Sequence, residues 1–127
     1  MKSNEDIIRT FWKLFDEAKF DEAGKLLSSD CNVYWPNTKE IFKSRDKFIL
    51  ANKVYPGRWF IDVKKIFTLD NIVISVVRVY SKDKNISFYA TSFFTFKNGL
   101  ISEIEEYYGQ ISEPPQWRIE QGLSEKY

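Results

Sequence analysis

A hairpin in the C-terminal third of the sequence carries the carboxylates that could do chemistry. Residues 88–108 are predicted as two apolar strands around Asn98-Gly99, a pair that tolerates positive φ and favours a tight turn. The second strand ends in Glu105-Glu106 among aromatic residues. A carboxyl group that points into such an interior has its charged form disfavoured, which raises its pKa and makes it usable as a general acid or base.

The sequence contains few residues that could support other kinds of catalysis. The 127 residues include no His and one Cys, Cys31, so the commonest general base, the commonest metal ligand and an intrachain disulfide are all missing. Without a His to activate it, Cys31 is predicted to be a small buried hydrophobe. No metal and no cofactor is expected, because the carboxylates lack metal-loop spacing and the five Gly form no phosphate-binding loop.

Composition also narrows the partners. Lys and Arg number 19 and Asp and Glu 18, a balance that gives no general attraction to nucleic acid or to anionic membranes. No apolar run approaches the roughly 20 residues of a membrane span, and residues 1–6 lack the apolar core of a signal peptide. With a single cysteine, a cytoplasmic location is expected.

The elements that would position Glu106 can be outlined from periodicity. Ser3 and Ser44 are plausible N-caps, and Pro56-Gly57 is a stop signal. Helices are expected at 4–18, 21–27 and 45–55, and strands at 31–35, 40–43, 58–69, 72–81, 86–96 and 100–108. The order predicts one α+β domain over residues 1–127, with three N-terminal helices packed on a curved, mostly antiparallel sheet.

The predicted strands are apolar on both faces. In 72–80, Val73 and Val77 alternate with Ile74 and Val76, and 86–96 shows the same two-sided pattern. Helices can cover only one side of the sheet, and large exposed apolar patches are rare on monomers. A homodimer through the outer sheet face is therefore expected.

The pattern resembles a known superfamily. Two helices, a strand ending in Val33-Tyr34-Trp35-Pro36, a capped third helix and a long meander are similar to nuclear-transport-factor-2-like proteins. Residues 92–101 followed by Glu106-Tyr107-Tyr108 resemble the SnoaL-like and ketosteroid-isomerase-like branch. The resemblance implies a cone, in which the curved sheet wraps around the helices and leaves an apolar cavity that often holds one or two carboxylates. Dimers through the outer face are common in this superfamily.

The catalytic positions that the resemblance implies are mostly lost. The isomerases use a helix tyrosine, a base before a proline and a protonated aspartate; here Phe11 or Trp12, Trp35 and Ser92 stand at those places. The epoxide hydrolases use an Arg-x-Asp pair, which corresponds to Val73 and Ser75. Their last-strand aspartate matches Glu106, and scytalone-type dehydration needs a histidine that this chain lacks.

The resemblance also gives the faces of the last strand. Counting by two from the inward-facing family position, Ser102, Ile104, Glu106 and Tyr108 should point into the cone, while Ile101, Glu103, Glu105 and Tyr107 should point out. Two other placements of Glu106 stay open: a solvated position at the rim, or an ion pair with Arg58, Arg78 or Arg118. Asp62 is expected to be a surface charge, because its neighbours Ile61 and Val63 are expected to face inward.

The aromatic content of 17% fits either a bulky core or the walls of a ligand pocket. The expected walls are Trp12, Phe15, Trp35, Phe48, Tyr55, Trp59, Phe94 and Tyr108. The expected polar neighbours of Glu106 are Asn52, Ser75, Ser92, Tyr55 and Tyr108.

Three functions follow from this reading. The first is a domain that binds a small apolar or aromatic molecule. The second is an isomerase, cyclase or hydrolase that uses Glu106 as its acid or base. The third is a dimeric interaction module whose cone is filled by its own side chains. The tail at Pro114–Trp117 could cover the cone mouth, pack outside or help the dimer.

Overall fold

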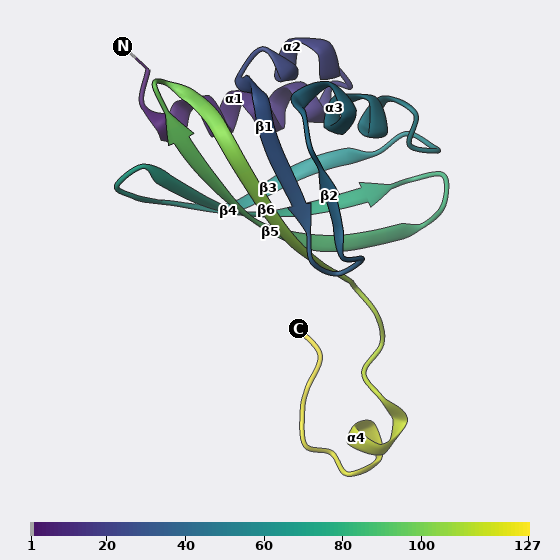
Figure 1. Ribbon diagram of the computed structural model, residues 1–127. Coiled ribbons are helices and arrows are strands. Elements are labelled where there is room, and N and C mark those ends of the chain that lie inside the picture. The colour runs from purple at the N-terminus through teal and green to yellow at the C-terminus, as the bar shows by residue number, and fades with distance from the viewer. Residues whose placement is uncertain (1) are drawn as a thin grey trace.

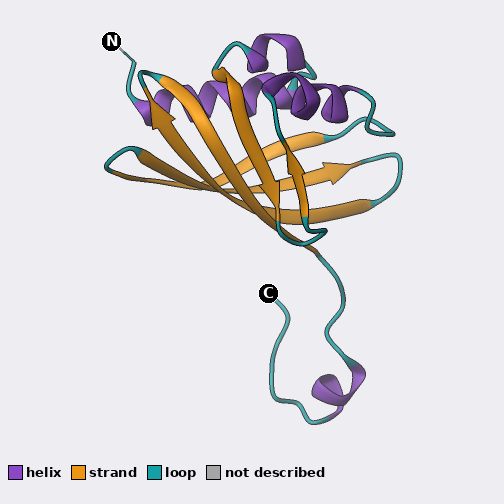
Figure 2. Cartoon of the chain, in the orientation of Figure 1, coloured by secondary structure: helices purple, strands orange, loops and turns teal. Residues whose placement is uncertain are grey.

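One curved sheet and the helices on its inner face make up the body of the protein (Figures 1 and 2). The computed structural model describes residues 2–127. The helices are α1 (Asn4–Asp16), α2 (Phe20–Gly24), α3 (Arg45–Lys53) and α4 (Gln116–Glu120). The strands are β1 (Leu27–Trp35), β2 (Glu40–Phe42), β3 (Phe60–Leu69), β4 (Ile72–Ser81), β5 (Ile86–Lys97) and β6 (Leu100–Gln110).

The six strands follow the order β2-β1-β6-β5-β4-β3. All neighbours are antiparallel except β1 and β6, which pair in parallel. Asn98 and Gly99 both have positive φ, at 53° and 79°, as the tight turn between β5 and β6 requires. The predicted α+β cone with a mostly antiparallel sheet is therefore confirmed.

Local capping starts the two longer helices where the sequence indicates. The Ser3 hydroxyl accepts a hydrogen bond from the Asp6 N–H at 3.1 Å, and the Asp6 carboxylate accepts one from the Ser3 N–H at 3.3 Å. Ser44 caps α3 in the same way through the Lys47 N–H, at 3.2 Å. These caps orient the apolar face of each helix toward the sheet.

Three expectations about the elements need correction. The third helix does not lie N-terminal to the sheet, since α3 follows β1 and β2, and a short α4 is added near the C-terminus. Leu27 belongs to β1 and not to the second helix, because parallel pairing with Ile101 extends the strand. Ile101 points inward and is fully buried, because a bulge at Ser102 shifts the alternation of β6.

The core lies between α1 and the inner face of the sheet. Phe11 packs edge-on against Phe94, with ring centroids 5.4 Å apart, and Trp12 lies beside both. Leu27, Val33 and Ile104 continue this cluster beneath the helices without exposure. Aromatic volume thus fills one end of the cone and fixes α1 on the sheet.

The outer face of the sheet remains uncovered in the single chain. Phe67 and Leu69 of β3 are 61% and 65% exposed, and Tyr107 of β6 is also exposed. The strand register places Ile74 and Phe93 between them. The expected apolar outer face is therefore present on this side.

Candidate functional site

A cavity of about 790 Å³ opens between the inner face of the sheet and the helices. Its buried lining residues form an apolar floor, and its exposed lining residues mark the mouth. The floor contains Trp12, Phe15, Phe48, Ala90 and Glu106. The mouth contains Lys53, Tyr55, Pro56, Gly57, Lys84, Gly109 and Gln110.

Glu106 is the acidic side chain of this cavity. It lies on β6 opposite Ser92 of β5, and it is 9% exposed. Burial raises the pKa of its carboxyl from 4.5 to about 7, and the Trp35 side chain offsets part of that rise. At neutral pH the carboxyl is therefore present in both protonated and charged forms, as a group that gives and takes protons needs.

Three polar atoms in the corner of the cavity around this carboxyl are sealed from solvent. Glu106 Oε1, Ser92 Oγ and Trp35 Nε1 are all buried without a hydrogen-bond partner among the described residues. Because the residue still lines the cavity, its other oxygen, Oε2, is the atom presented there. Unpaired buried polar atoms are rare and costly, which singles out this corner of the cavity.

A turn holds Trp35 beside Glu106. Asn37, two residues after Trp35, donates from Nδ2 to the Tyr108 carbonyl at 2.8 Å and accepts from the Tyr108 N–H at 3.0 Å. These two bonds bind the β1–β2 turn to the end of β6. They fix the indole at the carboxyl end of the cavity.

Most of the expected pocket residues do line the cavity, and three do not. Trp12, Phe15, Trp35, Phe48, Asn52, Tyr55, Trp59, Glu106 and Tyr108 are at its surface. Ser75, Ser92 and Phe94 are fully buried behind it. For two of them the reason is Trp12, whose Nε1 donates to Ser75 Oγ at 3.0 Å and whose ring packs edge-on against Phe94.

The expected polar neighbours of Glu106 are engaged elsewhere or sealed. Asn52 Nδ2 donates to the Phe48 carbonyl at 2.9 Å, and Tyr55 packs at the mouth against Trp59, with centroids 5.8 Å apart. Glu106 takes part in none of the ion pairs within residues 2–127. The alternatives of a solvated rim position and an arginine pair are both contradicted.

Several lining residues were missed because they come from segments far apart in sequence. Arg58 precedes β3, Lys84 lies in the β4–β5 turn, and Ala18 follows α1. The remaining apolar ones are Phe20, Ile61, Val79, Ile86, Phe88 and Ala90. Period-two alternation did point Ile61 inward, but nothing local in the sequence brings Arg58 and Lys84 to one opening.

Cys31 and Asp62 behave as expected from the sequence. Cys31 is fully buried, and burial together with nearby Asp30 and Glu103 raises its pKa to about 12. A thiol with that pKa is inert at neutral pH. Asp62 faces outward and pairs with Lys64 at 2.7 Å on the surface.

The tail does not close the mouth of its own chain. Trp117 on α4 is 56% exposed and does not line the cavity. Figure 1 shows the segment after β6 leading away from the body, with α4 apart from the sheet. The idea of Trp117 as a plug in its own cone is therefore wrong for this structure.

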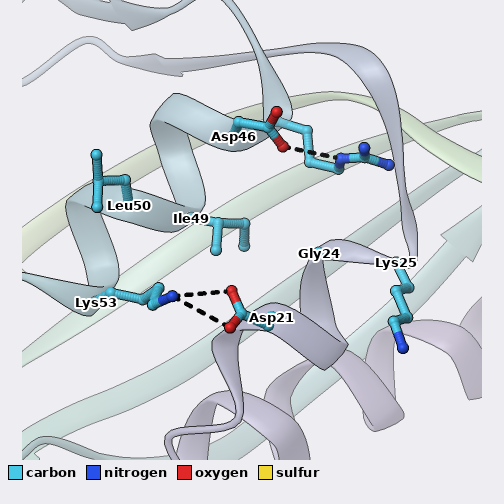
Figure 3. Close-up of a pocket in the computed structure, with 8 residues that line it drawn as sticks. Asp21, Gly24, Lys25, Asp46, Ile49, Leu50 and Lys53 are labelled. Atoms are coloured by element: carbon cyan, nitrogen blue, oxygen red, sulfur yellow. Dashed lines mark hydrogen bonds and ion pairs between the residues drawn. The ribbon is translucent and has the colours of Figure 1, made fainter.

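A second, smaller pocket of about 340 Å³ lies between α2 and α3 (Figure 3). Four of its five charged lining residues are paired: Lys53 Nζ contacts both oxygens of Asp21 at 3.1 Å, and Arg45 contacts Asp46 at 3.4 Å. Lys25 is the fifth and is in none of the ion pairs among residues 2–127. The candidate site is the larger cavity.

Residues 2–127 lack two other features. No helix there combines the length and the apolar character needed to cross a membrane. No group of three or more His, Cys, Asp or Glu side chains is placed there to hold a metal ion.

Comparison with known proteins gives the class of fold. No family model matches the sequence, and no curated protein is similar to it. A ketosteroid isomerase-like protein from Kribbella flavida is 22% identical, with a TM-score of 0.82 over 96% of this chain and 87% of that chain. An NTF-2-like protein of unknown function from Burkholderia xenovorans is 18% identical, with a TM-score of 0.81 over 97% and 94%.

A third similar structure holds a ligand. A protein of ketosteroid isomerase-like fold from Catenulispora acidiphila, solved with trimethylamine, is 10% identical, with a TM-score of 0.71 over 84% of this chain and 88% of that chain. A SnoaL-like polyketide cyclase shares the same architecture. This chain therefore has the nuclear-transport-factor-2-like fold, as its sequence resemblance implied.

Proposed function

We propose that this protein binds a small molecule with an apolar or aromatic body in the large cavity, and that Glu106 Oε2 contacts a polar atom of that molecule. The observation that carries the proposal is one buried carboxyl among aromatic side chains in a cavity of about 790 Å³. Ligand sites commonly combine a mostly apolar lining with a few placed polar groups. A cavity of this volume speaks against a self-filled cone. The trimethylamine complex of a protein with this fold adds support by analogy.

Filling the cavity is expected to abolish binding. The probe is 2-acetylnaphthalene, a neutral aromatic ketone. Its binding is measured by the quenching of the fluorescence of the cavity tryptophans. Ala90 lies on the floor, so Ala90→Val should weaken binding several-fold and Ala90→Leu should remove it. Thr91→Leu adds similar volume to the outer face and should leave binding unchanged, with circular dichroism confirming that each variant folds. Equal binding by parent and Ala90→Leu would contradict the proposal.

A catalytic role is the second candidate, and the raised pKa of Glu106 favours it. A carboxyl with a pKa of about 7 can take a proton from a bound carbon acid and return it to another atom. The test is turnover of each ligand that binds. Catalysis would be supported if the parent consumes the ligand and Glu106→Gln binds it with equal affinity but does not consume it. If neither protein changes the ligand, the catalytic role is contradicted and only the binding function remains.

We also propose that two copies associate through the outer sheet face. Exposed Phe67 and Leu69 support this, since apolar patches on that scale mark association surfaces. Phe67→Asp should convert a dimeric mass in solution into a monomeric one without loss of fold. Lys19→Asp on the helical side is the control, and light scattering is the measurement. A parent that is monomeric at micromolar concentration would contradict the proposed dimer.

We place the protein in a reducing compartment, the cytoplasm, on the basis of Cys31, a free buried thiol.

A further inference from the structure

The cavity carries an excess of positive charge that its own residues do not balance. Its charged lining residues are three cations, Lys53, Arg58 and Lys84, and one acid, Glu106. Glu106 sits on the floor, whereas Lys53 and Lys84 are exposed at the mouth. An aromatic interior is therefore joined to a cationic opening.

Two of the three cations lack a carboxylate partner. Lys53 is held by Asp21, but Arg58 and Lys84 take part in none of the ion pairs found among residues 2–127. Arg58 donates to the Trp59 carbonyl and, at 2.6 Å, to the Asp16 carbonyl. The carboxylate of Asp16 accepts from the Ile61 N–H at 2.8 Å instead.

Arg58 is thus held at the cavity by two backbone carbonyls. Its guanidinium also lies 4.3 Å from the ring centroid of Phe60. Backbone carbonyls orient a guanidinium but do not neutralise it, and five N–H donors leave capacity for another acceptor. The group is positioned in advance, which lowers the ordering cost of binding an anion.

Lys84 lies over Gly57 at the same opening. A β-carbon at Gly57 would be 3.3 Å from Lys84 Cε and 3.6 Å from Nζ, and 3.4 Å from Trp59 Nε1. Gly57 has a φ of +89°, so the backbone conformation and the close approach of Lys84 both favour glycine. The lysine head therefore lies beside the backbone of Gly57, the residue before Arg58, and both Lys84 and Arg58 line the cavity.

From this arrangement we infer that the ligand is an apolar or aromatic organic acid. Its body occupies the aromatic interior, and its anionic group lies at the mouth beside Lys84 and Arg58. The inference rests on the proposed binding function and adds the charge and orientation of the ligand. A cationic opening with apolar walls also attracts such anions from solution.

The test uses one aromatic body with two end groups: 6-acetyl-2-naphthoate and its neutral carboxamide. We expect the carboxylate to bind about tenfold more tightly than the carboxamide at low salt, because only the carboxylate gains the two cations. The preference should shrink at about 0.5 M salt, where charges at an exposed opening are screened.

Variants distinguish a specific effect of Lys84 at the mouth from the general effect of removing one positive charge. Lys84→Gln should reduce carboxylate affinity several-fold and leave carboxamide affinity unchanged, and Lys84→Arg should restore the preference. Lys97→Gln makes the same charge change at the other end of β5, where Lys97 is exposed and does not line the cavity. It should preserve the preference.

The outcomes distinguish this inference from the proposed function. If the parent binds the two probes with equal affinity and Ala90→Leu binds neither, the organic-acid inference is overturned. The proposed binding function is then still supported. Equal losses of carboxylate affinity for Lys84→Gln and Lys97→Gln would also overturn the organic-acid inference. No binding of either probe would contradict the proposed function and the inference together.

Discussion

Glu106→Gln is expected to raise the free energy of unfolding by about 3 kcal/mol at pH 8, and to leave it nearly unchanged at pH 4. In the unfolded chain this carboxyl has a pKa near 4.5, and burial raises the folded-state value to about 7. Between those values the folded protein holds a proton that the unfolded chain has released. Stability therefore falls as pH rises through this window and levels off above it.

Glutamine cannot titrate, so the Glu106→Gln variant does not lose stability as the pH rises through this window. Denaturant unfolding at a series of pH values measures the difference between parent and variant. Glu103→Gln on the exposed side of the same strand is the control and should follow the parent at every pH. A difference between parent and Glu106→Gln that stays constant from pH 4 to pH 8 would contradict the burial of this carboxyl.

Phe94→Ala is expected to cost about 3–5 kcal/mol of stability, the range for truncating a fully buried aromatic side chain. Phe94 is unexposed and packs against Phe11 and Trp12. Folded domains are stable by only about 5–15 kcal/mol, so this single change approaches the limit of folding. Equilibrium unfolding in urea gives the value.

The neighbouring residue provides the matched control. Phe93 is the next residue on β5 and points to the outer face. With both changes made in the Phe67→Asp background, which is expected to be monomeric, Phe93→Ala should cost much less stability than Phe94→Ala. Because Phe94 lies behind Trp12 and not at the cavity surface, the residual folded Phe94→Ala protein should bind 2-acetylnaphthalene with the affinity of the parent. Equal stability losses for the two variants would contradict the assigned faces of β5.

The elements that could be predicted are those with local signals. The bounds of β4 match the expected strand, because Asp70-Asn71 and residues 82–85 separate it from its neighbours. The Asn98-Gly99 turn fixed the hairpin of β5 and β6. Glu106 was placed inward because its position follows the family pattern beyond the bulge, where alternation by two holds.

The errors arose where distant parts of the chain decide the local structure. Ile101 was expected outside because counting by two cannot detect the bulge at Ser102. The local pattern predicts Leu27 in a helix, because its parallel partner Ile101 is 74 residues away in the sequence and leaves no local signal. The sequence did not indicate Arg58 and Lys84 for the same reason, since only the folded chain brings these two residues to one cavity.

The parallel pairing of β1 with β6 has a consequence for synthesis. A ribosome releases β1 long before β6, so until the last strand emerges the nascent chain can offer β1 only the short β2. The edge of β1 that pairs with β6 has no partner while residues 36–99 are synthesised. An unpaired strand edge of this kind is prone to pair with the wrong segment. The sheet can therefore be completed only after β6 has emerged, and a ribosome-bound chain stopped before residue 100 is expected to bind chaperones and resist compaction.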